Sequence, residues 1–352
     1  MTKEYNVAIL GATGAVGRRM IEQLEQSSIP VKNLKLLASS RSAGTKLSFR
    51  GKDYIVEETR PESFDGVDLV LSSAGGSVSK KFLPEAVKRG AVCVDNTSAF
   101  RMDPEVPLVV PEVNGQELKN HHGIIANPNC STIQMVMALE PVRRKYGLKQ
   151  IIVSTYQAAS GAGQSALNEL NQEAQDYLDG KDMQADAKIL PTKGDQKHYP
   201  LAFNLLPQID VFEEDGYSHE EWKMIHETKK IMLNDMDAPE IKVTATCVRV
   251  PVPISHGESV YFTVEDENAT ADDIRKVMAN FPGVVVQDDP AHQVYPQPID
   301  AVGRRETFVG RIRPDAENKG AFNAWIVADN LLKGAAWNAV ENAEYLVKED
   351  LI

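Results

Sequence analysis

Cysteine is scarce in this sequence. Only Cys93, Cys130 and Cys247 are present, an odd number at wide spacing. This distribution excludes a disulfide framework and a zinc cluster built on cysteines. We therefore predict free thiols, a reducing cytoplasmic compartment and no metal site.

Long hydrophobic runs and an excess of positive charge are also missing. No apolar segment approaches the roughly twenty residues of a membrane-spanning helix, and residues 1–3 lead into an apolar strand without a signal-peptide core. The 38 Lys and Arg residues are outnumbered by 50 Asp and Glu residues, which gives a net charge of −12. We therefore predict neither nucleic acid nor membrane as a partner, and expect a few placed cations to hold any anionic substrate.

The chain does have length and an enzyme-like composition. Its 352 residues exceed a typical single core, and 42% hydrophobic with 25% charged residues is usual for a soluble protein. We predict two domains, residues 1–130 with 331–352 and residues 131–330.

A glycine-rich turn stands near the start of the chain. Residues 5–10 are typical of a buried parallel strand, residues 11–17 follow the spacing Gly-x-x-Gly-x-x-Gly, and a helix is predicted to about Gln26. This arrangement receives a dinucleotide pyrophosphate, although the usual spacing is Gly-x-Gly-x-x-Gly and a plain tight turn is the alternative. The candidate cofactor residues here are Gly11, Thr13, Gly14, Ala15 and Val16.

The second predicted strand, residues 34–38, ends without the acidic residue that binds the ribose of NAD. Ser39, Arg41 and Ser42 follow it instead. Hydroxyl groups and a guanidinium suit a 2′-phosphate, so we predict NADP as the cofactor. A polar loop with a solvated Arg41 is the alternative.

Short apolar strands continue to alternate with helices up to about residue 130. Four more strands are predicted, at residues 67–71, 91–95, 108–110 and 123–126. A helix is predicted at residues 79–89, and a turn of small residues places Ser73 directly after a strand. This order predicts a Rossmann-type, doubly wound parallel sheet of the α/β class, with ligands beyond the carboxyl ends of its strands. Cys93 lies inside an apolar strand, so we assign it to packing.

Cys130 lies where an apolar strand gives way to an amphipathic helix. Asn-Pro-Asn precedes it and Ser-Thr follows it, in a stretch that spans residues 127–132. A thiol at a helix start meets unpaired N–H groups and the positive end of the helix dipole, which favour the thiolate. We predict that Cys130 is the nucleophile. The alternative, a buried structural cysteine, needs no such turn.

The pattern changes after about residue 148. Strands are predicted at residues 149–156, 242–250, 259–265 and 324–328, and helices at residues 164–178, 220–234, 271–280 and 331–349. Residues 190–215 form a long segment rich in proline and polar residues. We predict a second, α+β domain on a mostly antiparallel or mixed sheet, for catalysis and dimerisation. The last helix is placed with the first domain.

Four motifs, in order along the whole chain, resemble those of aspartate-semialdehyde dehydrogenases. They are residues 11–17, Asn-Cys-Ser-Thr at 129–132, Gln-Ala-Ala-Ser-Gly-Ala-Gly at 157–163, and Arg-Val-Pro-Val-Pro at 249–253 with His256-Gly257. The resemblance implies reversible, NADP-dependent oxidation of aspartate 4-semialdehyde with inorganic phosphate to 4-aspartyl phosphate. The reductive direction would serve lysine (diaminopimelate), threonine and methionine biosynthesis. The resemblance also implies a homodimer or a tetramer.

The implied chemistry requires a nucleophile, a base, a hydride acceptor and an anion site. Attack of Cys130 on the aldehyde and loss of hydride would leave a thioester, which phosphate then cleaves. His256 is the candidate base, because its ordinary pKa is near neutrality and it follows a predicted strand in a turn. The other six histidines lie in polar segments that look exposed. By resemblance, Gln157 orients the substrate or the thioester.

The substrate residues also follow from the resemblance. Arg249 would hold the carboxylate, Glu220 the ammonium group, and Arg101 with Lys223 the phosphate. Glu220 and Lys223 are three residues apart on a predicted helix and can face the same side, with an ordinary surface salt bridge as the alternative. Asn129 is a candidate to stabilise the oxyanion. Ser160, Gly161 and Asn330 are placed near the nicotinamide half of the cofactor.

Three other functions compete. N-acetyl-glutamyl-phosphate reductase shares the cysteine chemistry but takes a longer, acylated substrate, and glyceraldehyde-phosphate dehydrogenase is more distant. A catalytically silent homologue acting as an interaction module would typically have lost the nucleophile or the base, and both Cys130 and His256 are present.

Overall fold

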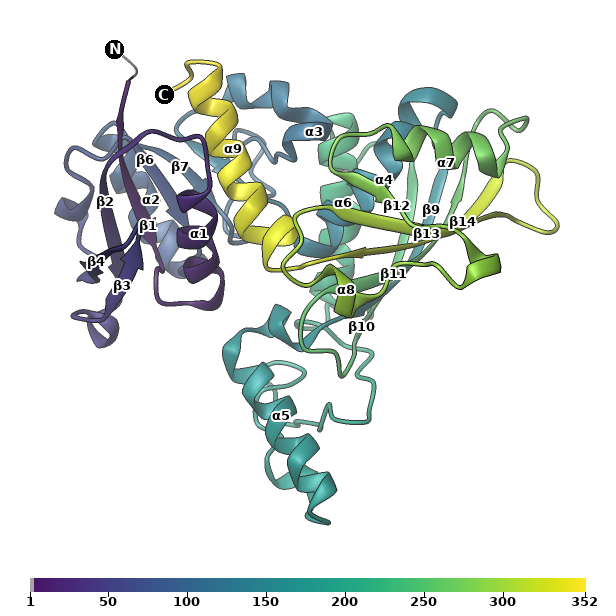
Figure 1. Cartoon of the computed structure of the whole chain (residues 1–352), viewed down its shortest axis with the longest axis horizontal. Helices are drawn as coiled ribbons and strands as arrows, with labels where there is room; N and C mark the ends of the chain where they lie inside the picture. The colour runs from purple at the N-terminus through teal and green to yellow at the C-terminus, as the bar shows by residue number, and fades with distance from the viewer. Residues whose placement is uncertain (1–2) are drawn as a thin grey trace. The chain divides into compact units, whose positions relative to one another are not determined.

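The computed structural model describes residues 3–352 and divides the chain into two compact units (Figure 1). Unit 1 comprises Met1–Asn129 with Ala335–Ile352, and unit 2 comprises Cys130–Gly334. The chain thus leaves unit 1 immediately before Cys130. No helix in residues 3–352 combines the length and the apolarity needed to cross a bilayer.

Unit 1 is built on six parallel strands in the order β5-β2-β1-β6-β7-β8. The strands are β1 Tyr5–Leu10, β2 Val31–Ala38, β5 Glu57–Glu58, β6 Leu69–Ser72, β7 Val92–Asp95 and β8 Ile124–Ala126. Because β1 lies between β2 and β6, the carboxyl ends of these three strands are neighbours at one edge. The doubly wound parallel sheet is confirmed, while the hairpin of β3 Lys46–Phe49 and β4 Lys52–Ile55 was not predicted.

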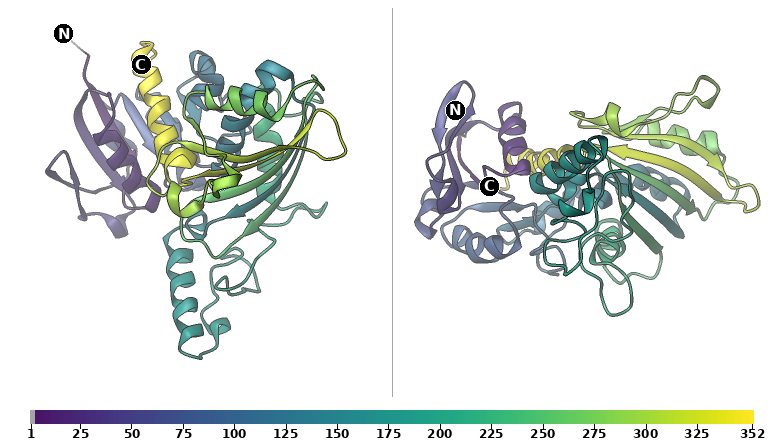
Figure 2. Two further views of the ribbon diagram at one scale, coloured as in Figure 1. Left: turned by 45° about the vertical axis from the view of Figure 1, so that its right-hand side comes forward. Right: turned by 90° about the horizontal axis from the view of Figure 1, so that it is seen from below.

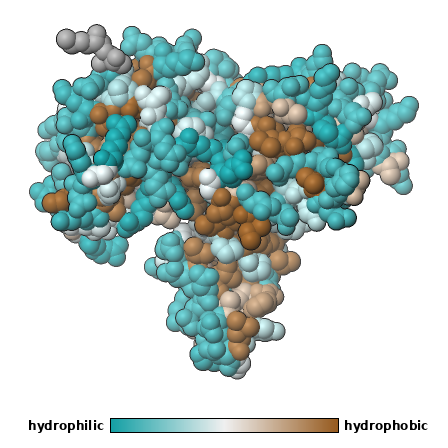
Figure 3. All heavy atoms as spheres, viewed as in Figure 1, coloured by the Kyte–Doolittle hydropathy of each residue, from teal (hydrophilic) through white to brown (hydrophobic). Residues whose placement is uncertain are grey.

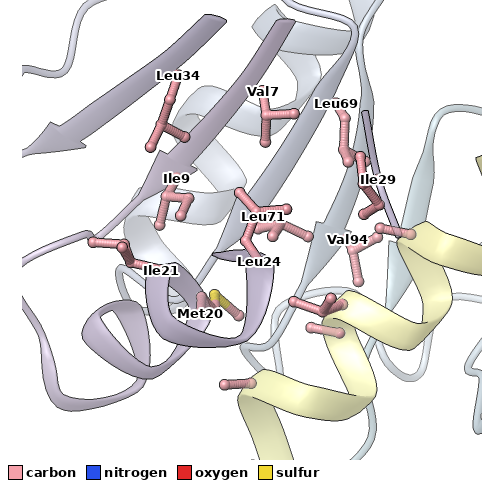
Figure 4. Close-up of a cluster of buried hydrophobic side chains, with 14 of the residues drawn as sticks. Val7, Ile9, Met20, Ile21, Leu24, Ile29, Leu34, Leu69, Leu71 and Val94 are labelled. Atoms are coloured by element: carbon pink, nitrogen blue, oxygen red, sulfur yellow. The ribbon is translucent and has the colours of Figure 1, made fainter. Parts of the chain in front are cut away.

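Helices cover both faces of this sheet because its buried strands are apolar on both sides. The helices of unit 1 are α1 Ala15–Glu25, α2 Gly76–Lys88, α3 Pro111–Asn114 and α9 Trp337–Lys348. On one face, Ile9 of β1 packs with Met20 and Leu24 of α1 (Figure 4). Val340 of α9 belongs to the same cluster. On the other face, the alternate residue Leu10 packs with Leu83 of α2. The last helix, α9, thus packs in the core of unit 1.

One predicted strand of unit 1 is wrong. Residues 108–110 form no strand, and a single bridge joins Leu108 to Ala126. Pro107 and Pro111 flank the segment, and proline removes the N–H groups that a ladder needs.

Unit 2 is built on a mixed sheet in the order β10-β9-β11-β14-β13-β12. The strands are β9 Gln150–Gln157, β10 Lys242–Arg249, β11 His256–Thr263, β12 Val284–Val286, β13 Thr307–Pro314 and β14 Ala321–Ala328. β9 pairs with β10 in parallel and with β11 antiparallel. The predicted mixed sheet is confirmed.

Three helices lie on one face of this sheet (Figure 1). They are α4 Cys130–Tyr146, α6 His219–Leu233 and α7 Ala271–Ala279. In β9, residues buried under the helices alternate with exposed or half-buried ones, as the two-residue period of a strand requires. The remaining helices are α5 Gln164–Leu178 and α8 Pro298–Ala301. α5 and the loops that follow it project beyond the β10 edge of the sheet (Figure 2).

Some predicted bounds in the later part of the chain are wrong, and two strands, β12 and β13, were missed. The strand predicted at 259–265 begins at His256, so His256 lies in the sheet and not in the preceding turn. The helix predicted from 331 begins as a π-helical stretch, Leu332–Ala336, before α9. β13 was not predicted, because Gly310 and a bulge between Gly310 and Arg313 interrupt its alternation.

Candidate active site

Cys130 is the first residue of α4. Gly334 lies directly against it, since a Cβ atom at Gly334 would come within 2.7 Å of the Cys130 Cβ. Only glycine permits this approach. The thiol therefore lies at a helix amino terminus, where unpaired N–H groups and the helix dipole favour the thiolate.

The other two cysteines are poor nucleophiles. Burial raises the pKa of the Cys93 thiol, and the charge of Asp95 raises it further. Burial and the charge of Glu220 likewise raise the pKa of Cys247. All three cysteines are free, and Cys130 alone is partly exposed. The packing role predicted for Cys93 agrees with its burial in the sheet.

His256, the first residue of β11, faces the thiol. Its Nε2 lies 3.2 Å from Cys130 Sγ, and its Nδ1 accepts a hydrogen bond of 3.0 Å from the backbone N–H of Ala158. A neutral imidazole carries one proton, and Nδ1 is acting as an acceptor, so that proton lies on Nε2. The sulfur is then the hydrogen-bond acceptor, which suits a thiolate.

The environment keeps His256 neutral. Its side chain is 0% exposed, and burial together with the charge of Arg249 lowers its pKa to about 3, against an opposing effect of Glu220. A second proton on the ring would also break the hydrogen bond from Ala158. All seven histidines fall within the described residues, and His256 is the only buried one.

Arg249 ends β10 and is paired with Gln157 of β9. The buried guanidinium donates from Nη1 to the carbonyl oxygen of Ala158 at 2.9 Å, and its Nε has no hydrogen-bond partner within residues 3–352. Burial lowers the pKa of Arg249, while the charges of Glu220 and Cys130 oppose this effect. A buried cation with a spare N–H is suited to an anionic ligand.

Gln157 connects the nucleophile helix with α6. Its Nε2 donates to the Ser131 hydroxyl and, at 3.0 Å, to Oε1 of Glu220. Glu220 Oε2 accepts from Lys223 at 3.3 Å, as the spacing on one helix face predicted, and Lys223 also donates to Asp210 at 2.8 Å. The Lys223 ammonium group therefore lies between two carboxylates.

The predicted cofactor residues of unit 2 lie beside this cluster. Ser160 and Asn330 are hydrogen-bonded to each other, and Asn330 Oδ1 also accepts from the backbone N–H of Ser255 at 2.9 Å. A Cβ atom at Gly161 would lie 2.8 Å from Arg249 Nη1 and 3.3 Å from His256 Cε1. The structure thus brings together all the site residues that were predicted within unit 2.

The glycine turn of unit 1 lies against the segment that follows β6. Gly11 has a φ of +88°, and a Cβ atom there would lie 2.9 Å from the backbone of Ala74. Ser73, predicted to bind cofactor, donates its backbone N–H to Leu10 at the end of β1. Gly14 precedes α1, so Thr13, Gly14, Ala15 and Val16 surround the amino terminus of that helix.

Ser39, Arg41 and Ser42 follow β2, at the edge where β1 and β6 also end. Arg41 is exposed. Arg101 is buried in unit 1, where it donates to the carbonyl oxygens of Asn127 and Asn96. Asn129 is the last residue of unit 1 before Cys130.

Comparison with known proteins identifies the family of the chain. A family model described as semialdehyde dehydrogenase, NAD binding domain, matches residues 6–121, and one described as semialdehyde dehydrogenase, dimerisation domain, matches residues 139–333. The aspartate-semialdehyde dehydrogenase of Bacillus subtilis (strain 168) is 55% identical over 352 residues, all of both chains. The chain belongs to the aspartate-semialdehyde dehydrogenase family. It is an NAD(P)-binding oxidoreductase of aspartate-family amino-acid biosynthesis.

Two solved structures of the family share its fold. Aspartate semialdehyde dehydrogenase II from Vibrio cholerae, solved in complex with ASA, has 41% identity, a TM-score of 0.91 and coverage of 99% of both chains. The Candida albicans enzyme with NADP has 27% identity and a TM-score of 0.76, over 99% of this chain and 100% of that one. The sequence-based identification of the family and of its activity is confirmed.

Three groups at the site were not predicted from sequence. The Ala158 N–H fixes the His256 ring, the Ser131 hydroxyl accepts from Gln157, and Asp210 pairs with Lys223. A backbone donor has no sequence signature, and Asp210 lies in an irregular segment without periodicity. Across residues 3–352, no three His, Cys, Asp or Glu side chains are grouped to hold a metal ion.

Proposed function

We propose that the chain oxidises aspartate 4-semialdehyde reversibly with inorganic phosphate to 4-aspartyl phosphate, with NADP as hydride acceptor and Cys130 as nucleophile. The observation that carries this proposal is the contact between Cys130 Sγ and His256 Nε2, made while Nδ1 accepts from Ala158. A thiolate at this position is ready to attack an aldehyde carbon.

In this proposal His256 acts mainly as a hydrogen-bond donor at Nε2. To act as the general base expected from the sequence, Nε2 must be free of its proton, which requires the other tautomer and loss of the Ala158 hydrogen bond. A reaction that begins from the thiolate needs no base for attack. The Nε2–H group first stabilises the sulfur anion and then the oxygen anion of the adduct.

The proposed reaction has three steps. The sulfur of Cys130 forms a bond to the aldehyde carbon, and the carbonyl oxygen becomes an oxyanion. The oxyanion reforms its double bond as hydride leaves the carbon, which gives a thioester on Cys130. A phosphate oxygen then attacks the thioester carbon, the C–S bond breaks, and Cys130 returns to the thiolate as acyl phosphate leaves.

Charged groups near Cys130 are suited to the substrate. The unpartnered Nε–H of Arg249 is available for the substrate carboxylate, and Glu220 for its ammonium group. Lys223, which already contacts Asp210 and Glu220, is assigned to phosphate together with Arg101. Asn129 is assigned to the oxyanion and Gln157 to orientation of the acyl group.

The residues of unit 1 fit a dinucleotide. The positive φ of Gly11 and its close approach to Ala74 leave the turn without side chains in front of the α1 amino terminus, where a pyrophosphate is favoured. Ser39, Arg41 and Ser42 would hold the 2′-phosphate of NADP, and Ser160, Gly161 and Asn330 are assigned to the nicotinamide half. When bound, the cofactor accepts hydride in the oxidative direction and donates it in the reductive one.

We also propose a cytoplasmic homodimer or tetramer, assembled through unit 2. The sheet face opposite α4, α6 and α7 exposes Ile152 and Tyr156 of β9, and Tyr156 packs on Trp325 with ring centroids 5.5 Å apart. Exposed hydrophobic side chains also gather on the part of unit 2 around β10 and α5 (Figure 3). We propose residues 242–265, which include β10 and β11, as the segment that supplies an intersubunit sheet.

The function is tested by following NADPH formation with aspartate semialdehyde in the presence and absence of phosphate. We expect sustained turnover with phosphate, and without it a burst of at most one NADPH per site, because the thioester accumulates. Cys130→Ala should abolish the burst while NADP still binds. A full burst in Cys130→Ala, or turnover without phosphate at the same rate, would contradict the proposal.

A further inference from the structure

A second pair of polar side chains lies beside the Cys130–His256 pair, on the same helix and the same strand. Gln134 of α4 and Glu258 of β11 are both buried, at 1% and 0% exposure. Further along β11 the same face carries apolar Val260 and Phe262. Burying an amide and a carboxyl group between a helix and a sheet costs free energy unless the two groups hydrogen-bond to each other.

The spacing of the two pairs matches. Cys130 and Gln134 are four residues apart on α4, or about 6 Å along a helix axis. His256 and Glu258 are two residues apart on β11, or about 7 Å along a strand. When α4 lies on β11 so that Cys130 reaches His256, Gln134 is therefore brought to Glu258.

Gln134 and Glu258 can bond to each other when Glu258 is protonated, which is the form that burial favours. Burial raises the pKa of Glu258 well above its ordinary range, and Gln134 is the one group that opposes this effect. A neutral carboxylic acid and an amide can each donate and accept. None of the four polar side-chain atoms has a partner at regular hydrogen-bond geometry within residues 3–352, so the facing side chain is the polar group available to each.

We propose that Gln134 and Glu258 are a positioning pair, which fixes the register of α4 on β11 and thereby holds Cys130 Sγ against His256 Nε2. A slip of the helix along the strand would separate both pairs together. A displacement of about 1 Å at the nucleophile is enough to cost on the order of 100-fold in rate. The inference rests on the proposed role of Cys130 as nucleophile.

The test compares variants of the full chain by turnover and by iodoacetamide alkylation of Cys130, followed by mass spectrometry. Glu258→Leu and Gln134→Met each remove one partner and keep the volume roughly constant. We expect each to lower kcat by about 10- to 100-fold with little change in KM, and to slow alkylation. The double variant should be no slower than either single one, because the pair acts as a unit.

Two controls separate positioning from simple stability. Glu258→Gln keeps a neutral group that donates and accepts, and should restore kcat and alkylation to near the values of the unaltered chain. Val260→Ala, at the next buried position on the same face of β11, should lower Tm without slowing alkylation. Wild-type alkylation in Gln134→Met, or a Glu258→Gln variant as slow as Glu258→Leu, would overturn the proposal. If Glu258→Leu does not fold, Gln134→Met and Glu258→Gln still decide.

Because alkylation requires no substrate, it is informative even if the proposed reaction is wrong. Activity in Cys130→Ala would refute the assignment of Cys130 as the nucleophile. The alkylation rates of the other variants would still show whether Gln134 and Glu258 fix the register of α4 on β11.

Discussion

Removing the charge of Arg249 should make the Cys130 thiolate harder to form. Because His256 is neutral, we infer that the positive charge balancing a thiolate at Cys130 comes from Arg249 and not from an imidazolium. We expect Arg249→Met to raise the pKa of Cys130, whereas Arg249→Lys, which keeps the charge, should change it much less.

The size of the effect follows from the contacts of Gly161. A Cβ atom there would lie 2.8 Å from Arg249 Nη1 and 3.5 Å from His256 Nε2, so these nitrogens are at most about 6.3 Å apart. Nε2 is 3.2 Å from Cys130 Sγ, which places Nη1 at most about 9.5 Å from the sulfur. At an effective dielectric constant of about 20, two unit charges at that distance attract by about 1.7 kcal/mol, or about 1.3 pKa units, and more if they are closer.

The assay is the rate of iodoacetamide alkylation of Cys130 between pH 5 and pH 9. A rise of 1.3 units lowers the thiolate fraction about 20-fold at any pH below both pKa values, since only the thiolate reacts. Coincident pH profiles for Arg249→Met and the unaltered chain would refute the assignment of the balancing charge to Arg249. Equal shifts in Arg249→Met and Arg249→Lys would show that packing, and not charge, is responsible.

Three further predictions follow from single residues. Arg41→Ala should raise KM for NADPH about 10- to 100-fold, by loss of charge-assisted hydrogen bonds, and leave KM for NADH unchanged; an equal change for both cofactors would contradict it. Gly161→Ala should lower kcat/KM at least about tenfold, because its Cβ would lie 2.8 Å from Arg249 Nη1, whereas Gly194→Ala, whose nearest neighbour is 3.8 Å away, should be neutral. Unfolded His256 gains a proton below about pH 6.5 while the folded ring stays neutral to about pH 3, so stability should fall as pH falls through this window. His256 contributes at most about 1.4 kcal/mol per pH unit to the pH dependence of the free energy of unfolding. Urea denaturation at several pH values should show that His256→Asn lacks this contribution.

Much of the fold was predictable because glycine and proline mark its turns. β1, the turn from Gly11 and the start of α1 follow one another without irregularity, and the predicted bounds of β1 match the structure. β13 was missed for the opposite reason, because Gly310 and positive φ at Arg311 break its alternation. Side-chain periodicity reports burial on a regular strand and gives no signal where the strand bends.

The site was predictable to the extent that its chemistry resides in side-chain type. Cys130 and His256 stand in recognisable local sequences, and the structure places them 3.2 Å apart. The tautomer of His256 depends on the N–H of Ala158, 98 residues away in the chain, which no local pattern encodes. Glu258 was overlooked because the predicted strand began only at residue 259, which left Glu258 in the turn before it.

The charges around Cys130 explain why a neutral histidine suits this site. Lys223 is matched by Asp210 and Glu220, and the buried guanidinium of Arg249 interacts electrostatically with Cys130. An imidazolium would place a second cation beside Arg249, and the repulsion between them contributes to the low pKa of His256. In the proposed mechanism the site therefore separates two tasks that one protonated histidine would combine: Arg249 would supply the charge that balances the thiolate, and His256 would supply a directed N–H.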